Sequence, residues 1–105
     1  MSLISAEELK KKIDNSESFT LLDVREAHEY YISDMDGTTR IPFHDLKERL
    51  SELDKNAEII TLCRSGNSAS DAAEILEENG FSNVSTLKGG INEWARKIDP
   101  SLSEY

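Results

Sequence analysis

The sequence predicts an α/β fold with a mainly parallel central sheet of about five strands and helices on both faces. Three short apolar runs without helical periodicity, at residues 19–24, 58–62 and 83–87, predict strands that are buried on both faces. Amphipathic segments lie between these runs, with apolar residues at the three- and four-residue spacing of a helix face. Because a crossover between parallel strands needs a connection of helix length, this alternation favours a parallel sheet.

The elements follow in a simple order along the chain. A capping box formed by Ser5, Ala6, Glu7 and Glu8 predicts a first helix from about residue 6 to residue 13. Three later segments carry helical stripes: Phe43, Leu46, Leu50 and Leu53; Ala69, Ala72, Ala73 and Leu76; and Ile91, Trp94, Ala95 and Ile98. Weaker extended segments near residues 2–4 and 38–41 bring the expected number of strands to five.

Length and charge restrict the architecture and the partners. With 105 residues, a mass of 11.8 kDa and no repeat or low-complexity linker, the chain is expected to form a single domain over residues 1–105. Twelve Lys and Arg oppose 21 Asp and Glu, which gives a formal net charge of −9. This charge disfavours a non-specific grip on nucleic acid or on an anionic membrane, so neither is an expected partner.

Cysteine content and hydropathy indicate the compartment. The single cysteine, Cys63, cannot form an intramolecular disulfide, and a cysteine-rich zinc site cannot be assembled from this chain alone. The N-terminal segment becomes charged by Glu7, and no apolar run approaches the roughly 18 residues of a membrane helix. We therefore expect a cytoplasmic protein, in a compartment where thiols stay reduced.

Cys63 directly follows the predicted strand at residues 58–62 and precedes the polar segment 64–68, after which a helical stripe begins. In open α/β sheets, ligands bind beyond the carboxyl ends of the strands. Gly66 permits a backbone conformation that turns successive main-chain N–H groups toward one point, and the helix N-terminus and Arg64 add positive charge. A free cysteine is more often a small buried hydrophobe, but these polar neighbours favour a reactive thiolate.

Four segments carry a resemblance to a known family. They are Leu21-Leu22-Asp23-Val24-Arg25-Glu26 followed by Glu29-Tyr30; Gly37 to Ile41-Pro42; Cys63-Arg64-Ser65-Gly66-Asn67-Ser68; and Gly80-Phe81 with Val84, Leu87, Gly89-Gly90 and Trp94. In order and spacing they resemble the rhodanese-like sulfurtransferases, over nearly the whole chain. Two segments depart from the family pattern. Residues 33–36 read Ser-Asp-Met-Asp where Gly-His-Ile-Pro is usual, and the sixth loop position is Ser68 rather than Arg, which removes one fixed positive charge for a dianionic donor.

The resemblance implies a sulfur-transfer reaction without a metal or an organic cofactor. Cys63 would be the catalytic nucleophile, and the substrate-binding residues would be Arg64, Ser65, Gly66, Asn67 and Ser68. Cys63 would take the outer sulfur of a small donor such as thiosulfate and hold it as a persulfide. Cyanide, a small thiol or a protein thiol would then accept this sulfur, since the chain has no second cysteine to resolve it.

Three other functions compete with this interpretation. A cysteine hydrolase would pair Cys63 with His28 or His44, but we favour solvated or locally hydrogen-bonded histidines. A phosphatase with a Cys-x5-Arg loop would need Arg where the chain has Ala69. A non-enzymatic persulfide carrier or protein-interaction module on the same scaffold shares every motif and stays the alternative.

Several other residues have structural interpretations. Asp23 and Arg25 are expected to pair or to cap a helix, and Trp94 is expected in the core. The acidic residues Asp71, Glu74, Glu77 and Glu78 are expected to form a solvated helix face, which could select a basic protein partner.

Overall fold

The computed structural model describes residues 2–105 and contains a five-stranded, fully parallel sheet with the strand order β1-β5-β4-β2-β3. The strands are β1 (Ser2–Ile4), β2 (Thr20–Asp23), β3 (Thr39–Arg40), β4 (Ile59–Leu62) and β5 (Val84–Leu87). The predicted fold class is therefore confirmed. The two weakly predicted strands, β1 and β3, form the two edges of the sheet.

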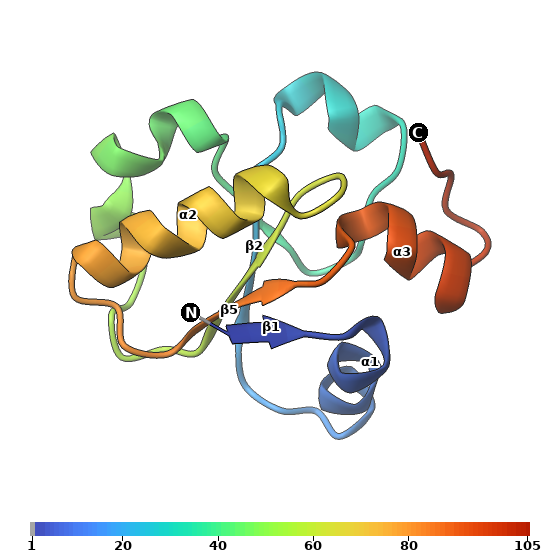
Figure 1. The fold of residues 1–105 in the computed structure, drawn as a ribbon, viewed down its shortest axis with the longest axis horizontal. Helices are drawn as coiled ribbons and strands as arrows, with labels where there is room; N and C mark the ends of the chain where they lie inside the picture. The colour runs from blue at the N-terminus through green and yellow to red at the C-terminus, as the bar shows by residue number, and fades with distance from the viewer. Residues whose placement is uncertain (1) are drawn as a thin grey trace.

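Helices cover both faces of the sheet (Figure 1). The helices α1 (Ala6–Asp14) and α3 (Gly90–Lys97) pack together on one face. On the other face, α2 (Asn67–Glu78) packs against β4, β5 and the 3-10 helix η2 (Phe43–Glu48). None of the helices in residues 2–105 has both the length and the apolar character of a membrane span.

The central strand β4 divides the core into two layers. Ile59 belongs to the buried cluster on the α2 face, whereas Ile60 and Leu62 belong to the cluster under α1 and α3. Trp94 is only 6% exposed and lies in the second cluster, which confirms its predicted place in the core. Thr61 also turns toward α2, where its hydroxyl donates to the Ala69 carbonyl at 2.8 Å. The alternation along β4 thus ties both layers to the one strand that leads to Cys63.

Local signals explain where the helices begin. The predicted capping box of α1 is present, since the Glu8 N–H donates to Ser5 Oγ at 3.0 Å and the Ser5 N–H donates to Glu8 Oε1 at 3.2 Å.

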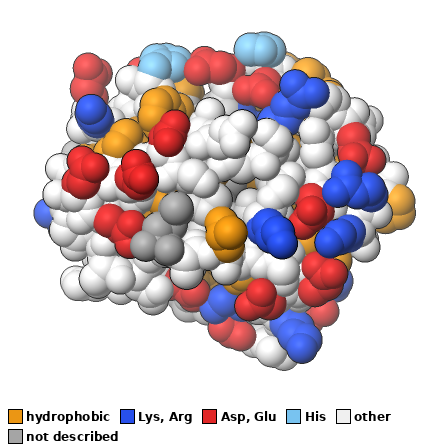
Figure 2. Space-filling view, viewed as in Figure 1, with side chains coloured by type: hydrophobic (Ala, Val, Ile, Leu, Met, Phe, Trp, Pro, Cys, Tyr) orange, Lys and Arg blue, Asp and Glu red, His pale blue; other side chains and the backbone are white. Residues whose placement is uncertain are grey.

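On α2, the acidic residues of the predicted helix face are exposed, and Figure 2 shows acidic side chains gathered over this side of the molecule.

The prediction of one continuous helical segment at residues 43–53 was wrong. This segment forms two 3-10 helices, η2 and η3 (Leu50–Glu52), separated at Arg49, whose φ of −115° and ψ of 14° leave the helical region. The Phe43 N–H donates to the Val24 carbonyl at 3.0 Å, which holds the start of η2 against the end of β2. The apolar residues are three apart within each half of the segment, Phe43 to Leu46 and Leu50 to Leu53, which suits the three-residue turn of a 3-10 helix, and the four-residue step between the halves spans the break at Arg49.

A buried ion pair secures the end of β2, as predicted for Asp23 and Arg25. Asp23 is fully buried and Arg25 is 2% exposed; Arg25 Nη2 donates to Asp23 Oδ2 at 2.7 Å, and Nε lies 3.1 Å from both carboxylate oxygens. Burial lowers the pKa of the Arg25 guanidinium, but hydrogen bonds to Asp23 and Tyr105 outweigh this effect and raise that pKa above its ordinary value. Arg25 therefore stays charged inside the protein.

We expect Asp23→Asn to lower the free energy of unfolding by about 3 kcal/mol, because the buried Arg25 keeps its charge and loses its hydrogen-bonded carboxylate partner, with only Asp34 left 3.9 Å away. Glu52→Gln is the matched control, since it breaks the exposed pair that Glu52 forms with Arg49 at 2.7 Å. This control should leave the urea midpoint unchanged within experimental scatter. Equal losses in the two variants would contradict the importance of the buried pair.

Candidate active site

Cys63 lies at the carboxyl end of β4, between the ends of β5 and β2. The Val24 N–H donates to the Leu62 carbonyl at 2.9 Å, so the chain leaving β2 stays beside the chain leaving β4. The Cys63 side chain is 5% exposed and contacts the apolar cluster on the α2 face. The thiol therefore lies at the carboxyl ends of the strands, where open α/β folds bind their ligands.

Two main-chain N–H groups donate to the Cys63 sulfur, from Gly66 at 3.0 Å and from Ala69 at 3.3 Å. Gly66 is the N-cap of α2 and has a φ of +114°, a conformation that glycine adopts without strain. Since Gly66 has no side chain to cap the helix, Cys63 Sγ takes the place of the capping oxygen at the Ala69 N–H. The sulfur thus lies at the N-terminus of a 12-residue helix, where partial positive charge is concentrated.

The N-terminus of α3 holds the main chain of Cys63 and Arg64. The Ile91 N–H donates to the Cys63 carbonyl at 2.9 Å, and the Asn92 N–H donates to the Arg64 carbonyl at 3.1 Å. Gly90 has a φ of +61°, and a Cβ atom there would lie 2.4 Å from the Cys63 carbonyl oxygen and 2.5 Å from that of Arg64. The absence of a side chain at Gly90 therefore allows α3 to support the cysteine segment directly.

A pocket of about 360 Å³ includes Cys63 in its wall. It is lined by the end of β2 with the 3-10 helix η1 (Ala27–Tyr31), by the start of η2, and by the segment around Cys63. These segments contribute Val24, Arg25, Glu26 and Glu29; Phe43 and His44; and Cys63, Arg64, Ser65, Asn67 and Ser68. The volume is in the range of small-molecule sites.

Most charged groups around this pocket have partners. His44 Nδ1 lies 3.0 Å from Glu26 Oε1, which agrees with the predicted locally hydrogen-bonded histidine. The main-chain N–H of Glu26 donates to Glu29 Oε2 at 2.8 Å, and Arg25 is paired with Asp23. Within residues 2–105, Arg64 is the pocket-lining basic side chain that forms no ion pair with a carboxylate side chain.

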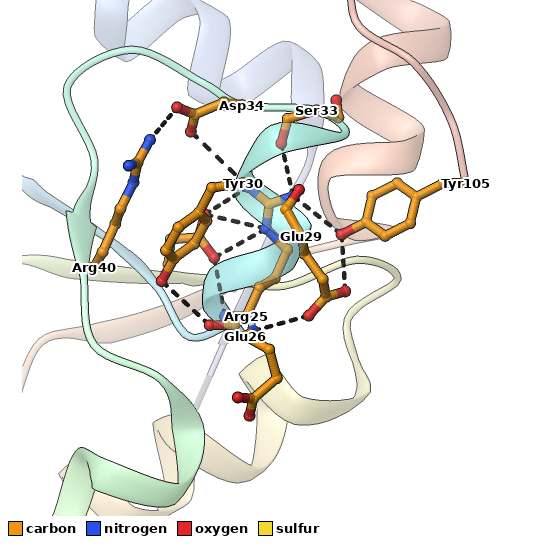
Figure 3. A network of polar contacts seen from close by, with 9 residues as sticks. Arg25, Glu26, Glu29, Tyr30, Ser33, Asp34, Arg40 and Tyr105 are labelled. Carbon is orange, nitrogen blue, oxygen red and sulfur yellow. Dashed lines mark hydrogen bonds and ion pairs between the residues drawn. The ribbon is translucent and has the colours of Figure 1, made fainter.

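Tyr105 connects the wall of the pocket to Arg64. Its hydroxyl accepts a hydrogen bond from Arg25 Nη1 at 3.0 Å and donates one to Glu29 Oε1 at 2.9 Å (Figure 3). Arg64 Nε donates to the main-chain oxygen of Tyr105, and the Arg64 guanidinium carbon lies 4.9 Å from the centroid of the Tyr105 ring. Tyr105 thus contacts Arg25 and Glu29 on one side of the site and Arg64 on the other.

The structure brings the predicted site residues together, with one correction. All of residues 63–68 except Gly66 line the pocket, and Gly66 contributes its N–H. However, α2 begins at Asn67, so Asn67 and Ser68 belong to the first helical turn and not to the loop before it. The Ser70 N–H already closes this turn on the Gly66 carbonyl at 3.0 Å. The helix α2 therefore begins at Asn67, closer to Cys63 than its apolar stripe, which starts at Ala69, indicates.

Sequence reasoning missed Tyr105 and Asn92 as parts of the site. The side chain of Asn92 holds the main chain of Tyr105 with two hydrogen bonds, of 2.9 and 3.0 Å. The partners of Tyr105 lie between 13 and 80 residues away along the chain, and no periodic pattern leads to this tyrosine. Glu29, by contrast, lies in the Glu-Tyr pair that carried part of the family resemblance, and this was the one signal for it.

We expect Gly90→Ala to cost about 2–4 kcal/mol of unfolding free energy, because the new Cβ strains the left-handed backbone and also strikes the main chain of Cys63 and Arg64. Gly37→Ala is a matched control: its φ is +76°, but a Cβ there meets nothing within 4 Å. The control should cost about 1–2 kcal/mol, from backbone strain alone. Chemical unfolding measures both losses, and a loss no greater at Gly90 than at Gly37 would contradict the close approach.

The pH dependence of stability should report on Tyr105. Burial raises the pKa of Tyr105, the hydrogen bond from Arg25 lowers it, and the bond to Glu29 raises it, so that it ends above its ordinary value of 10.0. Above pH 10 the unfolded chain loses this proton first, so the free energy of unfolding falls as the pH rises. The fall should be shallower in Tyr105→Phe than in the parent, whereas Tyr31→Phe, at a tyrosine that is 93% exposed, should follow the parent. Urea unfolding between about pH 9 and 11 checks this, and parallel curves for the parent and Tyr105→Phe would contradict it.

Comparison with a solved structure shows the same fold. The crystal structure of a rhodanese-related protein from Thermoplasma volcanium superposes with a TM-score of 0.84 at 28% sequence identity. The match covers 93% of this chain and 94% of that protein.

Two curated relatives and a family model agree with this result. The "Putative sulfurtransferase YtwF" of Bacillus subtilis (strain 168) is 34% identical over 97 residues, which cover 92% of this chain and 93% of YtwF. The "Adenylyltransferase and sulfurtransferase MOCS3-2" of Zea mays is 34% identical over 109 residues, which cover 97% of this chain but only 23% of the length of the maize protein. The family model described as Rhodanese-like domain matches residues 5–97. The chain therefore belongs to the rhodanese-like domain family, as its sequence motifs predicted.

Proposed function

We propose that this chain is a sulfurtransferase that moves sulfane sulfur from a donor such as thiosulfate to a thiophilic acceptor through a persulfide on Cys63. One observation carries the proposal: the Cys63 sulfur lines a small pocket and accepts two main-chain N–H hydrogen bonds at the start of α2. The names of the relatives YtwF and MOCS3-2 include sulfurtransferase activity, which supports the same reaction class.

In the first half-reaction, the Cys63 thiolate attacks the outer sulfur of thiosulfate. A new S–S bond forms on Cys63 while the S–S bond of thiosulfate breaks, and sulfite leaves with the electron pair of that bond. Cys63 then carries a persulfide. The N–H groups of Gly66 and Ala69 donate to the sulfur of Cys63, and their partial positive charge opposes the negative charge that the site must hold. Sulfite leaves as an anion, so this step needs no proton from the protein.

In the second half-reaction, the acceptor takes the outer sulfur. Cyanide attacks this sulfur, the bond to Cys63 breaks, and thiocyanate leaves while the Cys63 thiolate is regenerated. A small thiol or a protein thiol, reacting as its thiolate, would receive the sulfur as a new persulfide in the same way. Because Cys63 is the only cysteine in the sequence, the persulfide cannot close to a disulfide within the chain. The kinetics should therefore be ping-pong.

The arrangement of the chain and its compartment belong to the same proposal. Residues 1–105 act as one rhodanese-like domain, which is supported by the single parallel sheet and by the family match over residues 5–97. The protein works in the cytoplasm, where a lone catalytic thiol stays reduced. The proposed substrate-binding residues are Arg64, Ser65, Asn67 and Ser68, which line the pocket together with Cys63, and Gly66, whose N–H donates to the sulfur.

The test is the intact mass of the protein after incubation with thiosulfate. The expected result is one added sulfur atom, which disappears on addition of cyanide as thiocyanate forms, and which never appears on Cys63→Ser. Circular dichroism of Cys63→Ser verifies that the variant is folded.

Three other outcomes have defined meanings. A persulfide that forms from a small-thiol persulfide but not from thiosulfate would replace the donor named here. A persulfide that cyanide and thiols fail to discharge would favour the carrier function over the enzyme. No added sulfur from either donor would overturn the proposed function.

A further inference from the structure

Arg64 is held at the pocket by Tyr105 rather than by a carboxylate side chain. Its Nε donates to the main-chain oxygen of Tyr105, and its guanidinium packs over the Tyr105 ring at 4.9 Å. These contacts use Nε and one face of the guanidinium plane. Within residues 2–105, neither Nη atom of Arg64 has a hydrogen-bond partner or an ion-pair partner. Both Nη groups are therefore left for a ligand.

Tyr105 is itself held from three sides, so it can fix the position of Arg64. The side-chain amide of Asn92 donates to the main-chain oxygen of Tyr105 at 2.9 Å and accepts from its N–H at 3.0 Å. The phenol hydroxyl lies between Arg25 and Glu29, as Figure 3 shows. The main-chain N–H of Asn92 also donates to the Arg64 carbonyl, at 3.1 Å. The backbone and the side chain of Arg64 are thus both tied to the same small group of residues.

The charge of Arg64 matters because the other basic groups of the pocket are engaged. Arg25 is buried in its pair with Asp23, and His44 is bonded to Glu26. The sixth position of the cysteine segment is the uncharged Ser68. An anionic substrate that enters this pocket therefore finds its available positive side chain at Arg64. The planar guanidinium can donate two parallel N–H bonds to two oxygens of one oxyanion.

We propose that Tyr105 is a positioning residue, which holds Arg64 at the pocket so that its free Nη groups bind the oxyanion end of the sulfur donor. This inference rests on the proposed sulfurtransferase function and specifies its donor class: sulfane sulfur attached to an oxyanion, as in thiosulfate. Fixing the long side chain of Arg64 in advance lowers the entropy lost when the donor binds. A small-thiol persulfide without a nearby oxyanion gains nothing from this arrangement.

The first test compares the steady-state kinetics of variants with thiosulfate as donor and cyanide as acceptor. Tyr105→Leu keeps apolar packing against the core but removes the aromatic face and the hydroxyl. It should raise the KM for thiosulfate about tenfold, which is the effect of losing one charge-assisted hydrogen bond between Arg64 and the donor. The kcat should stay within about twofold of the parent value. Tyr105→Phe keeps the ring and the main-chain oxygen and should restore the KM to within about twofold of the parent. Tyr31→Leu, at an exposed tyrosine outside the site, should leave the KM unchanged.

A double-mutant cycle then separates positioning from general stability. Arg64→Ala should raise the KM for thiosulfate at least as much as Tyr105→Leu, and the double variant should be no worse than Arg64→Ala alone. With a neutral small-thiol persulfide as donor, Tyr105→Leu should behave as the parent does. Additive effects in the double variant, or an equal loss with both donors, would show a merely structural role for Tyr105 and overturn the inference.

A binding measurement distinguishes failure of this inference from failure of the proposed function. Thiosulfate is titrated into Cys63→Ser, which cannot transfer sulfur, and into the same variant with Tyr105→Leu. Weaker binding, by about tenfold, is expected in the second protein. Equal affinities would overturn the role of Tyr105 and leave the Cys63 chemistry untouched. Absence of a persulfide on the parent chain would instead overturn the proposed function, whatever the two affinities are.

Discussion

The site depends on two main-chain N–H groups that donate to one sulfur atom. Gly66 and Ala69 can direct these groups at Cys63 because only residues 63–66 separate the end of β4 from the start of α2, and because Gly66 adopts a left-handed backbone conformation. The N-terminus of a helix leaves N–H groups without partners inside the helix, and here the thiol satisfies one of them. The same contact therefore caps the helix and prepares the sulfur for chemistry.

The rest of the fold holds this contact in place. β4 lies in the interior of the sheet, with one core layer on each side, so the point where Cys63 leaves the strand is fixed by both layers. The N-terminus of α3 donates hydrogen bonds to the carbonyls of Cys63 and Arg64. The buried pair of Asp23 and Arg25 secures the end of the neighbouring strand, β2. Two helix N-termini thus meet at one segment: α2 donates to the sulfur, and α3 donates to the backbone that carries it.

The fold and the position of the cysteine could be predicted because they depend on local patterns. Short apolar runs, helical stripes and the capping box at Ser5 are properties of neighbouring residues, and each gave a strand or helix in the right place. The exceptions show where local patterns stop. The stripe from Phe43 to Leu53 has helical spacing, yet Phe43 is held by the end of β2 and Arg49 interrupts the helix, so two 3-10 helices form instead.

Sequence alone determined the α/β class, the family and the cysteine segment at residues 63–68, because strand and helix periodicity and the order of the motifs are written along the chain. Only the tertiary structure decided which groups surround the cysteine. Tyr105 meets Arg25, Glu29 and Arg64 across separations of 41 to 80 residues, and Gly90 reaches the cysteine backbone from another helix. Such contacts arise when the strands assemble into one sheet and bring distant segments together at the carboxyl ends of the strands. No local pattern in the chain encodes these contacts.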